Sequence, residues 1–219
     1  MKKTLTISAL LFSTTAFSAA PTSPFPADQT TADKIVKACE KANDSEMCLK
    51  KQGVNVFERK NKGHDLVVYT TNGKAFTFKD EGESNDDGTF YSYREYVPSH
   101  HFHIINVQTP GESYNVLLSD NGKKIETSSF HLSPTKELGY SINIEANPSV
   151  KIYDLNTLQL IWQSPLHNKM PTYTDRGQWL KDGSLQFTWM CTGEKTVNTR
   201  FLKQNGKWMM DGKICASNG

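Results

Sequence analysis

Residues 102–120 read FHIINVQTPGESYNVLLSD, two apolar segments on either side of a Thr-Pro-Gly-Glu sequence. Both segments are short and rich in β-branched and aromatic residues, which favour β-strands. If residues 109–112 form the connecting turn, Gln108 pairs with Ser113 and the two segments form an antiparallel hairpin. The same pattern of two short apolar segments joined by a turn recurs along the rest of the chain.

Similar segments follow one another over residues 54–219, which we expect to form one β domain. Turn signals lie between many of them, at Asn72-Gly73, Pro110-Gly111, Asn121-Gly122, Asp182-Gly183 and Asn205-Gly206. Strands joined by such turns predict an all-β, antiparallel body. The expected strands are VNVFERK (54–60), HDLVVYT (64–70), KAFTFKD (74–80), TFYSYREYV (89–97), FHIINVQ (102–108), YNVLLSD (114–120), LGYSINI (138–144), VKIYDLN (150–156), LQLIWQS (158–164), SLQFTWM (184–190), TVNTRFLKQ (196–204) and KWMMDGK (207–213).

The first residues have the layout of a secretory signal peptide. Two lysines precede an apolar run that is too short to span a bilayer, and small residues follow. We expect residues 1–18 to be the signal peptide, with cleavage after Ser18 or alternatively after Ala20, and residues 19–29 to be a flexible lead-in. The sequence therefore predicts a protein exported to the periplasm, with no stable insertion into the membrane.

Charge gives little reason to expect a nucleic-acid partner. Without Lys2 and Lys3 the chain has 23 basic and 23 acidic residues, so its net charge is close to zero. Proteins that bind nucleic acid usually carry a basic patch or a strongly basic domain. We therefore expect no nucleic acid among the partners.

Residues 30–53 carry a helical pattern and contain two of the four cysteines. An even number of cysteines in an exported chain favours disulfides, and the nearest neighbours are Cys39–Cys48 and Cys191–Cys215. One continuous helix would separate Cys39 from Cys48 by roughly 13 Å, beyond the ~7 Å over which a disulfide can form. We therefore expect a disulfide-linked helical hairpin that breaks at residues 43–45.

Two residue patterns suggest where these helices begin. Thr30 and Asp33 have the spacing of a capping box at the start of the first helix. Ser45 is expected to cap the second, shorter helix.

Residues 131–163, HLSPTKELGYSINIEANPSVKIYDLNTLQLIWQ, resemble one blade of a WD-repeat β-propeller. The resemblance rests on Ser133, Pro134, Val150, Ile152, Asp154 and Leu155, while Tyr153 stands where tryptophan is usual. Residues 177–189 resemble the same pattern more weakly, and no steady repeat of ~40–45 residues runs along the chain. The resemblance implies a small or partial β-propeller-like body; a β-sandwich is the alternative. Separately, residues 93–107 and the Leu-Ser-Pro at 132–134 resemble a stretch of exported bacterial proteins of unassigned role.

The histidines at the start of FHIINVQ are the main candidates for metal binding. Alternation along a strand places His101 and His103 on one face, and the hairpin register brings His101 to Asp120. Imidazole and carboxylate groups at this spacing can bind zinc or copper. The structural alternative is a strand with a polar end, in which His101 is hydrogen-bonded to Asp120 and no cofactor is present.

The residues expected to contact a partner are Tyr91, Tyr93, Arg94 and Tyr96. Tyrosine and arginine are concentrated at protein interfaces, although such a run is also common in strand packing. Alternation predicts that Tyr91 and Tyr93 share one face, with Arg94 and Tyr96 on the other.

The chain has no local motif of a hydrolase nucleophile, a zinc-protease helix or a phosphate-binding loop. We therefore expect a non-enzymatic periplasmic binding protein whose partner is another protein of the cell envelope. An inhibitor or immunity-type protein acting on an envelope hydrolase would fit this description. The alternatives are a metal-dependent hydrolase or metal-binding protein using His101, His103 and Asp120, and a structural component of an envelope assembly.

Overall fold

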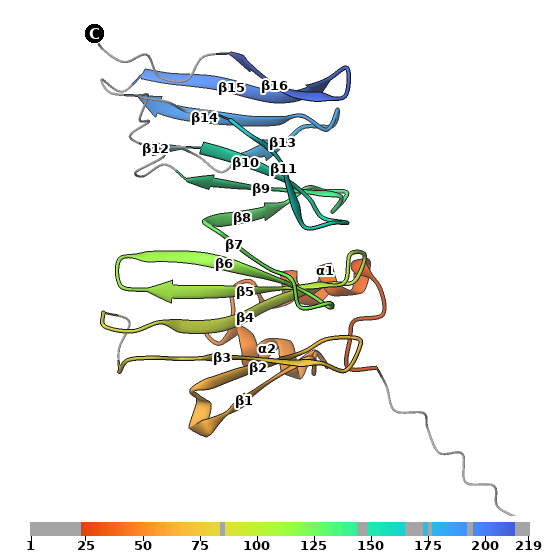
Figure 1. Cartoon of the computed structure of the whole chain (residues 1–219), viewed down its shortest axis with the longest axis vertical. Coiled ribbons are helices and arrows are strands. Elements are labelled where there is room, and N and C mark those ends of the chain that lie inside the picture. The colour runs from red at the N-terminus through yellow and green to blue at the C-terminus, as the bar shows by residue number, and fades with distance from the viewer. Residues whose placement is uncertain are drawn as a thin grey trace, which may run out of the picture.

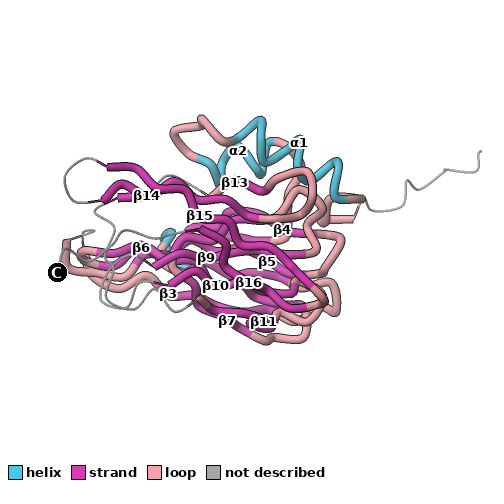
Figure 2. The backbone as a smooth tube through the Cα atoms, turned by 90° about the horizontal axis from the view of Figure 1, so that it is seen from above, coloured by secondary structure: helices cyan, strands magenta, loops and turns pink. Residues whose placement is uncertain are grey.

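The computed structural model describes residues 23–83, 86–143, 149–164, 173–174, 177–191 and 195–212. Two short helices precede a series of antiparallel β-sheets, which are stacked along the long axis of the molecule from β1–β3 to β12–β16 (Figure 1). No sheet is closed on itself in the described part of the chain. The expected all-β class is confirmed, and the two helices lie at one side of the stack (Figure 2).

The helical segment forms the predicted disulfide. The two helices are α1 (Gln29–Cys39) and α2 (Ser45–Lys51), and the Cys39–Cys48 bridge holds the two Cα atoms 5.6 Å apart. Both caps differ from the prediction because an aspartate precedes each helix. Asp28 accepts a hydrogen bond from Thr31 N and Asp44 accepts one from Met47 N, which satisfies amides of the first turn.

The second predicted bridge lies partly outside the described residues. Cys191 is disulfide-bonded, whereas Cys215 belongs to the residues that the structure does not describe. The pairing Cys191–Cys215 therefore stays a prediction. The predicted signal peptide, residues 1–18 with cleavage up to residue 20, also lies outside the described residues and stays a prediction.

Each sheet is built from strands that follow one another along the chain. The first sheet has the order β1-β2-β3 and the second the order β4-β5-β6-β7. The strands are β1 (Phe57–Lys60), β2 (Asp65–Tyr69), β3 (Ala75–Lys79), β4 (Phe90–Val97), β5 (Phe102–Thr109), β6 (Glu112–Ser119) and β7 (Lys124–Thr127), with a short 3-10 turn η1 (Asn61–Gly63) between β1 and β2.

The third sheet has the order β11-β10-β9-β8 and covers the segment that resembles a propeller blade. The fourth has the order β12-β14-β15-β16, with β13 also paired to β14. The strands are β8 (Ser129–Leu132), β9 (Leu138–Asn143), β10 (Ser149–Asp154), β11 (Gln159–Gln163), β12 (Tyr173–Thr174), β13 (Gln178–Trp179), β14 (Leu185–Cys191), β15 (Lys195–Gln204) and β16 (Lys207–Gly212).

The apolar core is divided into three layers, because each sheet packs a face against the next one. The first layer joins the helices, the first sheet and one face of the second sheet around Phe57, Leu66 and Ile105. The next layer lies between the second and third sheets, where Ile104 and Leu117 meet Tyr153. The last layer lies between the third and fourth sheets, and all four tryptophans belong to it or pack against it.

The free edge of β4 is covered by polar side chains from the first sheet and the second helix. Asp80 Oδ1 accepts a hydrogen bond from Tyr91 N at 2.8 Å, and Glu46 Oε1 accepts one from Tyr93 N at 2.7 Å. Arg59 pairs with Glu46 through Nε at 2.8 Å and with Asp80 through Nη1 at 3.1 Å. These contacts occupy two amides that an edge strand would otherwise expose to another chain, and they attach α2 to the sheets.

Candidate functional site: a histidine pocket at the turns

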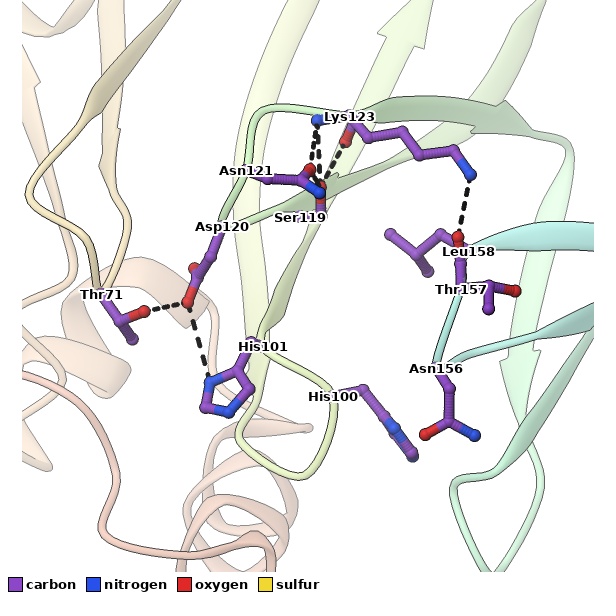
Figure 3. Close-up of a pocket in the computed structure, with 10 residues that line it drawn as sticks. All are labelled: Thr71, His100, His101, Ser119, Asp120, Asn121, Lys123, Asn156, Thr157 and Leu158. Carbon is purple, nitrogen blue, oxygen red and sulfur yellow. Dashed lines mark hydrogen bonds and ion pairs between the residues drawn. The ribbon is translucent and has the colours of Figure 1, made fainter.

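A cavity of about 350 Å³ lies where turns of three sheets meet (Figure 3). The first sheet contributes the β2–β3 turn, the second contributes the β4–β5 and β6–β7 connections, and the third contributes the β10–β11 turn. The residues that line the cavity, here called the histidine pocket, are Thr71, His100, His101, Ser119, Asp120, Asn121, Lys123, Asn156, Thr157 and Leu158.

Asp120 is held in place by two residues of the β2–β3 turn and one residue of β4. The Thr71 hydroxyl donates a hydrogen bond to Asp120 Oδ2, and Asn72 Nδ2 donates to the Asp120 backbone carbonyl at 2.7 Å. The Tyr96 hydroxyl donates to Oδ2 at 3.4 Å. Partial burial favours the neutral acid, but the neighbouring His103 and Thr71 outweigh that effect and hold the pKa of the Asp120 carboxyl below its usual value. Asp120 is therefore an ionised, positioned group at neutral pH.

His101 is the exposed member of the group, with 67% of its side-chain surface accessible. Its backbone has a positive φ of 54°, which is uncommon for a residue other than glycine and ends the connection before β5. The ring atom Nδ1 lies 3.1 Å from the Tyr96 hydroxyl and 3.7 Å from Asp120 Oδ2, as Figure 3 shows for the carboxylate. His101 can therefore contact both Asp120 and a ligand from solvent.

His103 is completely buried, with an exposed fraction of 0%. Its Nδ1 lies 3.0 Å from the Tyr93 hydroxyl, and its Nε2 lies 3.7 Å from Asp120 Oδ1. Burial lowers the pKa of the His103 imidazole, and the nearby carboxylate of Asp120 offsets only part of that effect. His103 is therefore neutral at physiological pH.

The three residues predicted as metal ligands are brought together around one carboxylate. The register places His103 opposite Leu118, and the Asp120 amide donates to the His101 carbonyl at 3.0 Å. His101 and His103 approach different oxygens of Asp120, each at 3.7 Å. Within the described ranges, however, no three histidine, cysteine, aspartate or glutamate side chains are arranged to hold a metal ion. Zinc or copper at these residues stays a hypothesis.

The opposite wall of the histidine pocket was not predicted from the sequence. His100 Nδ1 is buried and has no hydrogen-bond partner in the described structure. His100 extends from the same β4–β5 connection as His101, toward the side of the cavity where Asn156 extends from the β10–β11 turn (Figure 3). Lys123 Nζ donates to the Thr157 carbonyl at 2.8 Å and so connects the β6–β7 and β10–β11 turns. The sequence marked this wall only as connections between predicted strands, and it did not indicate that these connections meet.

The tyrosines predicted to contact a partner are arranged differently from the prediction. The β4–β5 register shifts between Tyr93 and Glu95, so Arg94 occupies a β-bulge. The extra residue places Tyr96 opposite His103 and on the same face as Tyr91 and Tyr93, which corrects the predicted alternation.

Two of these tyrosines are too buried to contact a partner directly. Tyr93 and Tyr96 lie in the interior, and Tyr93 stacks on Phe57 with a ring distance of 4.3 Å. Tyr91 is half-buried against Phe78, at 5.3 Å. Arg94 lines a cavity at the other end of the sheet, and Tyr96 lines the cavity beside the segment before α1.

The segment before α1 packs beside the histidine pocket. Phe25 lies over Tyr96 with a ring distance of 4.9 Å, and the Pro24 carbonyl accepts a hydrogen bond from Asn55 N. A second cavity of about 510 Å³ lies between this segment and the β2–β3 turn, and His101 lines it as well. Residues 23–28 belong to the predicted flexible lead-in of residues 19–29, and of these Phe25 packs on Tyr96 of the β domain.

The comparisons do not assign the chain to a family. No family model matches the chain, and no curated protein is significantly similar to it in sequence. Among the described residues, no helix combines the length and the apolar character needed to cross a bilayer. The function proposed below is therefore inferred from the residues of the histidine pocket and its surroundings.

Proposed function

We propose that this protein is a non-enzymatic binding protein that recognises another protein of the cell envelope at the histidine pocket. The observation that carries the proposal is an apolar pair directly beside that pocket. Leu158 lines the cavity, and β11, which begins at the next residue, exposes 47% of Leu160 and 44% of Ile161. An apolar group next to a polar cavity is typical of a contact surface.

The position of β11 supports a polypeptide as the partner. β11 is the edge strand of the third sheet, so one side of its backbone is not paired within that sheet. An extended segment of a partner can add to such an edge, while side chains from that segment enter a neighbouring pocket. Here the pocket offers His100, His101 and Asn156 to polar groups of the partner.

The scaffold suits recognition. We further propose that the four sheets are blade-like units of a partial propeller, since each consists of consecutive strands and packs on the next. In such an arrangement the turns at one end of the sheets meet, as they do at the histidine pocket. Small-angle scattering tests the shape: an elongated particle supports a partial propeller, whereas a disc with the first and fourth sheets in contact contradicts it.

The proposed cellular role is supported by the signal-peptide pattern of residues 1–18, which is typical of proteins exported to the periplasm. There, an inhibitor or immunity-type protein that blocks an envelope hydrolase would use a surface of this kind. Deletion strains test this role, because cells without the protein should become more sensitive to one envelope hydrolase. Unchanged resistance to all hydrolases tested would contradict the inhibitor role while leaving the binding site untested by that assay.

The binding site itself is tested by affinity capture from envelope extract with paired variants. The wild-type protein should retain a defined partner with micromolar or tighter affinity. The double variant Leu160→Asp/Ile161→Asp should lose it, because two carboxylates replace the apolar contact. Met209→Asp is the matched control, since Met209 is also an exposed apolar residue (49%) on an edge strand, β16. Equal capture by all three proteins would contradict the proposed site.

A further inference from the structure

A third cavity, of about 370 Å³, lies between the second and third sheets at the end away from the histidine pocket. β5 runs from Phe102, next to His101, to Thr109 at the β5–β6 turn, and the cavity is reached at Gln108. The lining residues, here called the arginine cleft, are Ser92, Arg94, Asn106, Val107, Gln108, Ser113, Tyr114, Asn115, Ser129, Phe130 and His131.

The cleft forms because the face of the second sheet that packs on the third sheet changes from apolar to polar side chains along each strand. On β5, Ile104, Asn106 and Gln108 share one face, and Ile104 belongs to the apolar layer between the second and third sheets. Beyond Ile104 the same face becomes polar, and Ser92, Asn106 and Asn115 form a row across β4, β5 and β6. Amide and hydroxyl groups therefore line one end of an interface that is otherwise apolar.

Arg94 is the permanently charged group of the cleft, and its bulge position directs it there. Its Nε lies 3.4 Å from Glu95 Oε1, which is buried beside it. Nη1 makes only long contacts, 3.5 Å to Asn115 Oδ1 and 3.4 Å to the Phe130 carbonyl. A guanidinium can donate five hydrogen bonds, so much of the donor capacity of Arg94 is left for a ligand.

We propose that the arginine cleft binds a carboxylate, with Arg94 as its ion-pair partner and the surrounding amides and hydroxyls as further hydrogen-bond groups. The planar guanidinium matches a carboxylate in a two-point contact. None of the described residues that line the cleft is acidic, and the neighbouring Glu95, which pairs with Arg94 Nε, is buried outside that lining. The carboxylate can belong to a free acylated amino acid or to an acidic side chain in a polypeptide.

The test is a titration of isotope-labelled protein followed by nuclear magnetic resonance. The probes are N-acetyl-glutamate, its neutral counterpart N-acetyl-glutamine amide, and a blocked tripeptide with a central glutamate. We expect saturable shifts at Arg94, Asn106 and Asn115 with the acidic probes and at least tenfold weaker binding of the neutral probe. Tighter binding of the tripeptide would identify a polypeptide source, and equal binding would identify the carboxylate alone as the recognised group.

Variants separate this site from the histidine pocket and from folding defects. Arg94→Gln should weaken binding of N-acetyl-glutamate at least tenfold. Arg200→Gln is the matched control, because Arg200 pairs with Asp182 on the fourth sheet and should leave binding unchanged. If Arg94→Gln does not fold, Ser113→Phe fills the rim of the cleft without removing the charge and should also abolish the shifts. No saturable shift with either acidic probe, or equal binding of the neutral probe, would overturn the proposal.

Discussion

His103 and Asp120 face each other in the interior, with Nε2 of the imidazole 3.7 Å from Oδ1 of the carboxylate. Neither atom has a hydrogen-bond partner in the described structure, although both are buried. The other ring nitrogen of His103 contacts the Tyr93 hydroxyl. A proton added to His103 would place a charge in a buried position, so this pair makes the fold sensitive to acid.

The first prediction is a loss of stability below about pH 6.5, the ordinary pKa of histidine. The pKa of His103 is lower in the folded protein than in the unfolded chain, so the unfolded chain binds the proton first and stability falls as the pH falls. Urea unfolding gives the free energy of unfolding at each pH. From about pH 8 to pH 5 this free energy should fall for wild type and should fall less steeply for His103→Asn.

Two comparisons make the pH experiment specific. His64→Asn should keep the wild-type slope, because His64 is exposed. Glu95 acts in the opposite sense, since burial raises the pKa of its carboxyl and its contribution is lost as the pH rises. The difference in pH dependence between wild type and His103→Asn therefore measures the contribution of His103. An identical pH dependence of the two proteins would contradict a role of His103 in acid sensitivity.

The Cys39–Cys48 bridge should stabilise the helical segment against the sheets. Replacing both cysteines with serine removes the loop constraint and should lower the free energy of unfolding by roughly 3 kcal/mol. Denaturant unfolding measures this change. Lys41→Ser, in the exposed connection between the helices, should leave the midpoint unchanged. An unchanged midpoint for the cysteine variant would show that the bridge contributes nothing to the folded state.

The edge of β4 depends on Glu46. Glu46→Ala leaves Tyr93 N without its acceptor and Arg59 without its main partner, so it should lower the free energy of unfolding by about 2 kcal/mol. Hydrogen exchange should also become faster at the Tyr93 amide. Glu58→Ala removes a carboxylate from an exposed pair with Lys60 and should change stability little. Equal effects of the two substitutions would argue against the edge contact.

We expect the purified protein to contain no stoichiometric zinc or copper. Elemental analysis of protein purified without chelator should find far less than one metal ion per chain, and added zinc should not raise the unfolding temperature. His101→Ala is the informative variant because the His101 side chain is exposed and its loss should not unfold the domain. One equivalent of metal that disappears in this variant would instead support the metal-binding alternative.

Much of the sheet structure could be predicted from local sequence. Each of the predicted segments contains a strand, because β-branched runs separated by glycine turns favour hairpins. Gly73 and Gly122, for example, both have the positive φ that such turns require. β7 and β8 were missed because each is only four residues long and carries little apolar pattern.

The β-bulge at Arg94 could not be predicted, since nothing in an alternating strand marks where an extra residue is inserted. The same limit applied to the candidate site. The hairpin register predicted the proximity of His101 and Asp120, because that pairing is local, and the Asp120 amide donates to the His101 carbonyl. Thr71 and Asn156 reach the pocket from other sheets, through packing that no short motif records. The aspartate caps of the helices were misassigned because several residues near each helix start are suitable caps.

Contact between the histidine pocket and a protein partner can be tested by site-specific photo-crosslinking in living cells. A photoreactive residue at Asn156, on the rim of the pocket, should give one discrete crosslinked protein. The same residue at Lys207, exposed on β16, should give none. No crosslinked product from position 156, or the same products from both positions, would contradict the proposal that the histidine pocket contacts a protein partner.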